Sequence, residues 1–262
     1  VGLFIGFAIK VPIWPFHTWL PDAHVEAPTP ISVILAGVLL KMGTYGFLRF
    51  SYPLAPEAAV KFAPYMAVLA VIGIIYGGFV ALAQKDFKKM VAYSSVSHMG
   101  FVVLGLAAMN PAGFSGAMLQ MFNHGIITSG LFLLVGVIYD RAHTRDMTAF
   151  GGLAAQLPLY SGILLFFSMA SLGLPGLAGF ISEFLILFGG LQYNLLVAGL
   201  SSLGIFLAAA YLLFMVRRVL FGPANPKWQG LGEINRLELM TLIPLMVLIV
   251  ILGVSPQLIL NY

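Results

Sequence analysis

Long apolar runs separated by short polar links dominate this chain. A helix needs about 20 predominantly apolar residues to cross a bilayer. Runs of that kind are found at 1–20, 30–50, 61–83, 90–109, 113–139, 158–190, 194–219 and 237–260. No soluble domain, linker or low-complexity tract separates them. The pattern therefore predicts one all-α, polytopic membrane domain with about eight transmembrane helices.

Two of these runs are predicted to be broken inside the membrane. Pro12 and Pro15 follow Lys10 in the first run, and Pro175-Gly176 interrupts the run 158–190. Proline removes a backbone donor and clashes with the preceding helical turn. Non-helical backbone at membrane depth persists only against protein or a hydrated cavity, and paired broken helices are typical of transporters. A plain proline kink is the alternative for each run.

Composition excludes a water-soluble protein. The chain is 60% hydrophobic and 8% charged, against about 25% charged residues in soluble domains. Its net charge of +4 therefore reflects membrane topology rather than nucleic-acid binding. Cysteine is absent, which excludes disulfides and thiolate-held iron–sulfur clusters within this sequence.

The basic residues are distributed as the positive-inside rule requires. Loops at 20–30, 84–89, 140–157 and 217–236 hold Lys85, Lys88, Lys89, Arg141, Arg145, Arg217, Arg218, Lys227 and Arg236. Only Arg49 and Lys61 fall on the opposite side. This bias supports strict alternation of the spans. Because the chain opens with Val1 inside an apolar run, we expect it to be the C-terminal part of a longer protein.

Lys41 and Glu183 are the strongest candidates for buried chemistry. Lys41 lies about two turns from either end of its span, too deep to reach the headgroups easily. Glu183 follows the Pro175-Gly176 break and is the acidic residue predicted inside the membrane. Ionisable groups at this depth are costly and mark proton or ion pathways. The structural alternative is a simple lysine–carboxylate pair.

Three further side chains are candidates for proton transfer. Lys10 lies beside the first predicted break, and His98 and His124 lie in polar patches within apolar spans. Histidine titrates near neutral pH and can relay protons, although a hydrogen-bonded structural histidine is equally compatible with the pattern. His17, His24 and His143 are interpreted as interfacial. No zinc-binding His-Glu-x-x-His or nucleotide-binding Gly-x-Gly-x-x-Gly motif is found, so no metal or cofactor site is predicted.

Three segments carry a resemblance to a known family. They are the proline- and histidine-containing stretch 10–29, which includes Lys10-Val11-Pro12 and His17-Thr18-Trp19-Leu20-Pro21-Asp22, and the stretches 92–101 and 139–146. The first strongly resembles the antiporter-like subunits of respiratory complex I, which are similar to subunits of multi-subunit sodium/proton antiporters. The other two are most similar to the M-type branch. The resemblance runs essentially from end to end.

The resemblance implies an antiporter-like inverted-repeat fold. Residues 1–60 would hold the last two helices of one repeat, 61–219 a second repeat, and 220–262 a C-terminal loop and helix. The family's two central lysines match Lys10 and Lys41, and its terminal glutamate matches Glu183. Its axial histidines match His98 and His124. The glutamate that partners the first lysine belongs to an earlier helix of the family, outside this sequence.

The leading hypothesis is a proton-translocating membrane subunit of NADH:quinone oxidoreductase, a translocase. The resemblance implies that NADH, FMN, iron–sulfur clusters and quinone are bound by other subunits, with no redox site in this chain. Expected partners are neighbouring antiporter-like subunits and the lipid bilayer, not nucleic acid. A bacterial inner membrane is preferred over a mitochondrial one. The alternatives are a sodium/proton antiporter subunit, a membrane-bound hydrogenase subunit and a structural membrane scaffold.

Overall fold

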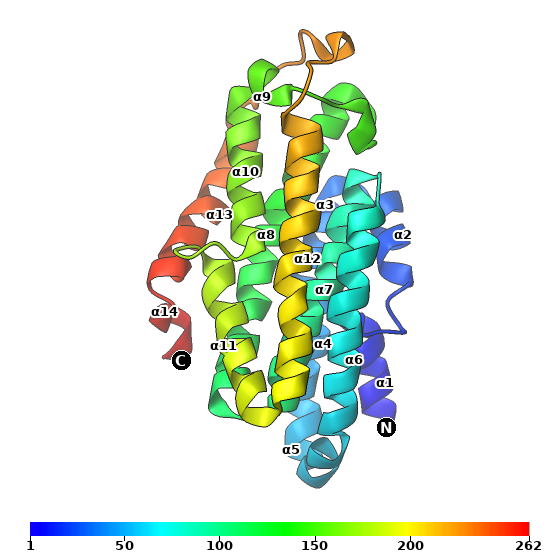
Figure 1. Ribbon diagram of the computed structural model, residues 1–262, viewed down its shortest axis with the longest axis vertical. Helices are drawn as coiled ribbons and strands as arrows, with labels where there is room; N and C mark the ends of the chain where they lie inside the picture. Colours follow the sequence, from blue (N-terminus) through cyan, green and yellow to red (C-terminus); the bar gives the residue numbers. More distant parts are fainter. Residues whose placement is uncertain (262) are drawn as a thin grey trace.

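The computed structural model describes residues 1–261, and its regular elements are helices (Figure 1). The α-helices are α1 Gly2–Lys10, α2 Trp19–Glu26, α3 Thr29–Ile34, α4 Leu40–Gly46, α5 Tyr52–Leu54, α6 Pro56–Ala83, α7 Phe87–Ala108, α8 Pro111–Ala142, α9 Leu153–Gln156, α10 Pro158–Leu172, α11 Ala178–Tyr193, α12 Leu195–Leu220, α13 Arg236–Val254 and α14 Gln257–Leu260. Two π-helical turns, Leu35–Leu39 and Phe47–Ser51, join α3, α4 and α5 into one bent helix.

Six helices among the described residues are long and apolar enough to cross a membrane. They are Thr29–Leu54, α6, α7, α8, α12 and α13. The remaining two spans are divided, the first into α1 and α2 and the second into α10 and α11. The prediction of about eight spans with two broken is confirmed. The first span reaches Glu26 rather than residue 20, because α2 continues beyond its break.

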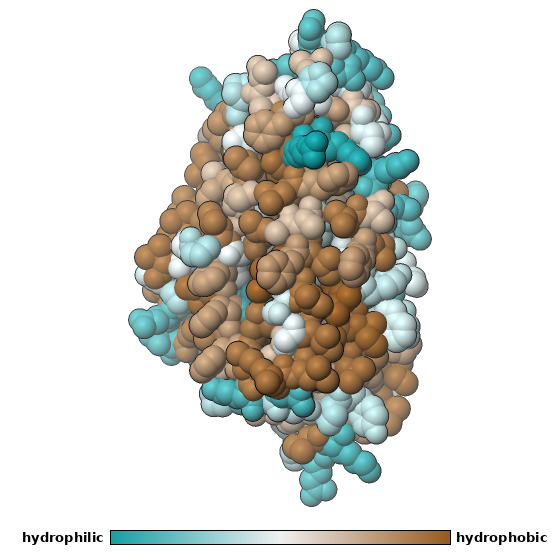
Figure 2. Space-filling model, viewed as in Figure 1, coloured by the Kyte–Doolittle hydropathy of each residue, from teal (hydrophilic) through white to brown (hydrophobic). Residues whose placement is uncertain are grey.

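The bundle is built around α7. In α7, 94% of the most apolar window is buried, against 22% in α13 and 33% in α12. The outer helices instead expose large apolar side chains such as Phe184, Phe206 and Leu248. Figure 2 shows this apolar surface as a broad band between hydrophilic ends. A surface of this size suits lipid rather than water, so the polar side chains of the interior are the unusual ones.

The second broken span ends its first half with a Schellman motif. Gly173 adopts the left-handed conformation (φ +82°), which glycine accepts without the strain of a side chain. Its N–H donates to the Ala170 carbonyl (3.3 Å), and the Leu174 N–H donates to the Met169 carbonyl (3.1 Å). These bonds satisfy carbonyls that a helix end would otherwise leave unpaired. Pro175 follows and prevents the helix from continuing.

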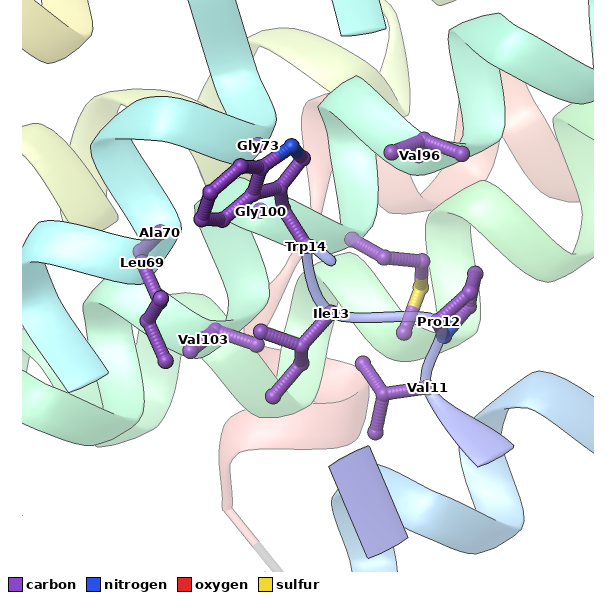
Figure 3. A pocket seen from close by; sticks show the side chains of 11 residues that line it. Val11, Pro12, Ile13, Trp14, Leu69, Ala70, Gly73, Val96, Gly100 and Val103 are labelled. Atoms are coloured by element: carbon purple, nitrogen blue, oxygen red, sulfur yellow. The ribbon is translucent and has the colours of Figure 1, made fainter. Parts of the chain in front are cut away.

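The first break packs against the centre of the bundle. Residues 11–14 lie against α6 and α7, where Figure 3 shows Ile13 and Trp14 beside Ala70 and Gly100. The cavity between them measures about 10 Å³ and is lined mainly by apolar side chains. A buried water needs several polar partners, so this cavity is a packing defect rather than a binding site.

The four predicted basic loops gather at one end of the bundle. The Phe87 N–H donates to the Arg145 carbonyl, and the Met147 N–H donates to the Lys85 carbonyl, each at 2.9 Å. Arg145 Nε lies 3.2 Å from Asp86 Oδ2. The Gly152 N–H donates to the Phe221 carbonyl, which attaches the fourth loop. The grouping of these loops agrees with the predicted alternation of the spans, although Lys88 is buried, with its amine donating to the Ala27 carbonyl (2.6 Å).

Arg141 holds the C-terminal helix α13 against the bundle. Its guanidinium donates to both carboxylate oxygens of Glu238, at 2.9 and 2.7 Å. It also donates to the carbonyls of Gly232 (2.7 Å) and Glu233 (3.0 Å). Such bidentate, charge-assisted contacts are strong and directional. At the far end of α13, Gly253 lies against the backbone of Leu177 in the second break.

We expect Arg141→Ala to loosen α13. Removing one partner of a partly buried, bidentate ion pair leaves the Glu238 carboxylate uncompensated, at a cost of about 3 kcal/mol. Limited proteolysis of the 221–235 loop should therefore accelerate by roughly 100-fold. Arg236→Ala is the control, since Arg236 is exposed and makes no ion pair with any residue in 1–261. Equal cleavage rates in the two variants would contradict the assignment.

Candidate functional site

A polar cluster lies in the middle of the bundle, around the carboxylate of Glu183. Glu183 is 4% exposed. Its Oε1 accepts hydrogen bonds from His98 Nδ1 (2.8 Å) and Gln120 Nε2 (3.1 Å). The three residues come from α11, α7 and α8. A carboxylate buried in an apolar medium needs such donors to remain ionised.

Gln120 is itself oriented by a hydroxyl from the same broken helix. Ser182 Oγ lies 2.5 Å from Gln120 Oε1 and donates to it. Asn123 Nδ2 donates to the Ala178 carbonyl (2.7 Å) and to Ser182 Oγ (3.2 Å). With its oxygen occupied, the amide of Gln120 presents its N–H group to Glu183. The first turn of α11 is thereby linked to α8 through polar side chains.

Close approach of two backbones brings Lys41 to this cluster. A Cβ on Gly37 would meet Ser129 Oγ at 2.7 Å, and one on Gly125 would meet the Gly37 carbonyl at 2.9 Å. Glycine at both positions therefore lets the Thr29–Leu54 helix contact α8 directly. One result is that Lys41 Nζ lies 2.7 Å from His124 Nδ1.

The π turn before Lys41 gives its amine a second partner. Such turns offset the backbone hydrogen bonds by one residue, and they occur frequently at functional sites. The Leu40 N–H donates to the Leu35 carbonyl, five residues back. Lys41 Nζ donates to the Ala36 carbonyl within this turn. The amine is thus held between a carbonyl and an imidazole, without a carboxylate partner among the described residues.

The contact with Lys41 determines which histidine nitrogen carries the proton. When Lys41 is an ammonium, it must donate to His124 Nδ1, so the imidazole proton sits on Nε2. His124 Nε2 is buried and has no hydrogen-bond partner in the described chain. His124, His98 and Glu183 all line one cavity of about 10 Å³. That volume is about the minimum for one water molecule, and this cavity has the polar lining that a water requires.

These contacts form a line of four titratable side chains across the core. Lys41 contacts His124, the His124 and His98 rings lie 5.7 Å apart between centroids, and His98 contacts Glu183. Each member can bind or release a proton, and direct contacts or a one-water cavity separate neighbours. The arrangement is therefore suited to passing protons through a region that bulk water does not reach.

The structure brings together four of the five predicted site residues. Lys10, the fifth, lies in an open groove of about 380 Å³ lined by Gly2, Leu3, Gly6, Phe7 and Met42. Its amine makes no ion pair within residues 1–261, so its role stays a prediction. The interpretation of His17 and His24 as interfacial is wrong, because they are 2% and 0% exposed. His24 stacks on Phe132 with centroids 4.4 Å apart.

Sequence reasoning did not select several polar side chains of this cluster. They are Gln120, Asn123, Ser171, Ser182 and Tyr211. One signal was present, because Gln120 lies four residues before His124 and so shares its helix face. Ser171 and Tyr211 lie on other helices, and only the packing shows that they meet His98. No group of three or more metal-ligating side chains occurs in the part of the chain described.

Comparison with known proteins gives a consistent result. The family model described as "NADH:quinone oxidoreductase/Mrp antiporter, TM" matches residues 1–209. Subunit M of NADH-quinone oxidoreductase from Rhodobacter capsulatus is 49% identical over 260 residues, covering 99% of this chain and 51% of that protein. NADH-ubiquinone oxidoreductase chain 4 from Marchantia polymorpha is 49% identical over 258 residues, covering 98% and 52%. The chain thus spans about half the length of these relatives.

Solved structures are similar over nearly the whole chain. A chain of respiratory complex I from Thermus thermophilus matches with a TM-score of 0.91 and 36% identity, covering 98% of this chain and 55% of that one. A chain of the Mrp complex from Dietzia sp. DQ12-45-1b gives a TM-score of 0.90 at 20% identity, covering 98% and 56%. The second match shows a shared fold alone.

Gln120→Leu tests whether the cluster stabilises the broken span. The substitution removes one of the two donors to Glu183, and it leaves the Ser182 hydroxyl only the Ala178 and Gly179 carbonyls of its own helix. A hydrogen bond to a charged group contributes about 1.5–3 kcal/mol, so hydrogen exchange of the α11 amides should accelerate roughly tenfold or more. Met118→Leu, on the exposed face of the same helix, should leave exchange unchanged. Unaltered exchange in Gln120→Leu would show that the cluster does not hold α11.

Proposed function

Because this chain belongs to the NADH:quinone oxidoreductase/Mrp antiporter transmembrane family, with relatives named as complex I subunit M, we propose that it translocates protons in a NADH:quinone oxidoreductase. One observation carries the proposal. Lys41, His124, His98 and Glu183 form a line of titratable side chains within an apolar bundle. A plain structural helix bundle has no need of such a line, since buried ionisable groups are costly.

The driving force for transfer is electrostatic. In a medium of low effective dielectric constant, a charge on one member changes the proton affinity of the next. A proton leaving Lys41 for His124 Nδ1 places positive charge on an imidazole that lines the cavity shared with His98 and Glu183. His98 Nδ1 is in contact with Glu183 Oε1, where a proton neutralises the carboxylate. Lys10 would extend the line on the side of the first break.

Electron transfer belongs to other parts of the assembly in this proposal. NADH, FMN, iron–sulfur clusters and quinone would be bound by other subunits, and this chain would act as part of a translocase. Its apolar outer surface would contact lipid and neighbouring antiporter-like subunits. The bacterial relatives support a bacterial inner membrane as the location in this proposal. The division into a partial repeat at 1–60, a repeat at 61–219 and a C-terminal loop and helix at 220–262 belongs to the same proposal.

Removing either end of the line should block proton translocation. In the assembled enzyme, Glu183→Gln and Lys41→Ala should each lower the rate of NADH-driven proton uptake into membrane vesicles by about tenfold or more, since a positioned acid or base typically contributes 10²–10⁴-fold. Glu57→Gln is the matched control, because Glu57 is exposed in the first turn of α6. Wild-type pumping in both test variants would favour a structural scaffold and overturn the proposal.

The antiporter alternative differs in the ion that it requires. The Mrp match has 20% identity, whereas the matches to complex I subunits reach 49%. We therefore expect NADH-driven proton uptake in sodium-free buffer to equal that in sodium buffer, with no uptake of labelled sodium. Coupled sodium movement that Glu183→Gln abolishes would favour the antiporter.

A further inference from the structure

His98 has two nitrogens with different surroundings, and only Nδ1 faces Glu183. Its Nε2 lies 3.1 Å from the hydroxyl of Tyr211 and 3.3 Å from that of Ser171. These hydroxyls come from α12 and α10, so the imidazole on α7 contacts side chains from three other helices. Neither hydroxyl belongs to the line of titratable side chains described above.

A hydroxyl can serve either protonation state of an imidazole, because it both donates and accepts. When His98 is neutral with its proton on Nδ1, the Nε2 lone pair accepts a hydrogen bond from a hydroxyl. When His98 is an imidazolium, Nε2–H donates to the hydroxyl oxygen. The side chain therefore gains and loses a proton without leaving a buried nitrogen unpaired, which would cost about 1–3 kcal/mol.

Tyr211 is well placed for this task. Its side chain is 1% exposed, and its ring is part of the main apolar core of the bundle. A buried tyrosine hydroxyl needs a polar partner, and His98 Nε2 is within hydrogen-bond distance. The rigid ring fixes the hydroxyl in place, whereas the shorter Ser171 side chain lies slightly farther from the same nitrogen.

We propose that Tyr211 is a positioning residue for proton transfer: its hydroxyl orients His98 so that Nδ1 faces Glu183, and it stabilises the imidazolium that forms during transfer. The residue does not itself carry the proton. The inference rests on the proposed function, and it adds a side chain from α12 to the line formed by α4, α8, α7 and α11.

The test is Tyr211→Phe in the assembled enzyme, which removes the hydroxyl and keeps the ring. Because hydrogen bonds to charged groups are the stronger ones, the substitution disfavours the imidazolium. The rate of NADH-driven proton uptake should fall about fivefold, and its pH profile should shift to lower pH. The groups that face His98 are Glu183 from α11, His124 from α8, Tyr211 from α12 and the hydroxyl of Ser171 from α10. The profile therefore reports on this group of side chains.

Tyr160→Phe is the matched control. Tyr160 is equally buried, but its hydroxyl donates to the Leu134 carbonyl (3.3 Å), away from His98. It should leave the pH profile unchanged. Equal effects in the two variants, or a wild-type rate and profile in Tyr211→Phe, would overturn the inference.

A third variant keeps the test decisive if Tyr211→Phe does not assemble. Ser171→Ala removes the second hydroxyl at Nε2, and it should shift the profile in the same direction by a smaller amount. An unshifted profile there would overturn the idea that Nε2 needs a hydroxyl. The proposed function fails separately, through wild-type pumping in Glu183→Gln, whatever the tyrosine variants show.

Discussion

The absence of bulk water in the core is the constraint on which the rest of this structure depends. An ionised carboxylate there must find donors in the protein or be neutralised. Glu183 finds two, His98 and Gln120, and each of these is held in turn by hydroxyls on other helices. The polar cluster is therefore required for packing as well as for chemistry, since removing one member takes a hydrogen-bond partner from its neighbours.

The second break and the π turn before Lys41 also provide hydrogen-bond partners in a region without bulk water. Just after the break at Gly173–Leu177, Asn123 donates to the Ala178 carbonyl in the first turn of α11. The π turn before Lys41 leaves the Ala36 carbonyl able to accept from the lysine amine. In both places, irregular helical backbone supplies partners for polar side chains where solvent cannot.

Much of the fold was predictable from the sequence, because apolar run length and proline position are local signals. The spans, both breaks and the grouping of basic loops at one end follow from them. The burial of His24 and Lys88 was not predictable, since each lies near a polar link and becomes enclosed only when α2 packs against α7 and His24 stacks on Phe132. Lys41 and Glu183 could be selected as site candidates from the sequence, because each is an ionisable residue inside a long apolar run. Tyr211 did not, because a buried tyrosine looks like an ordinary core residue until its hydroxyl partner is known.

The attachment of α13 at both ends has a mechanical consequence. Arg141 fixes its beginning to the end of α8, and Gly253 seats its end against Leu177 at the break. The break can therefore shift little along the membrane normal relative to α8. The second break is thus clamped between α8 and a helix that is itself tied to α8.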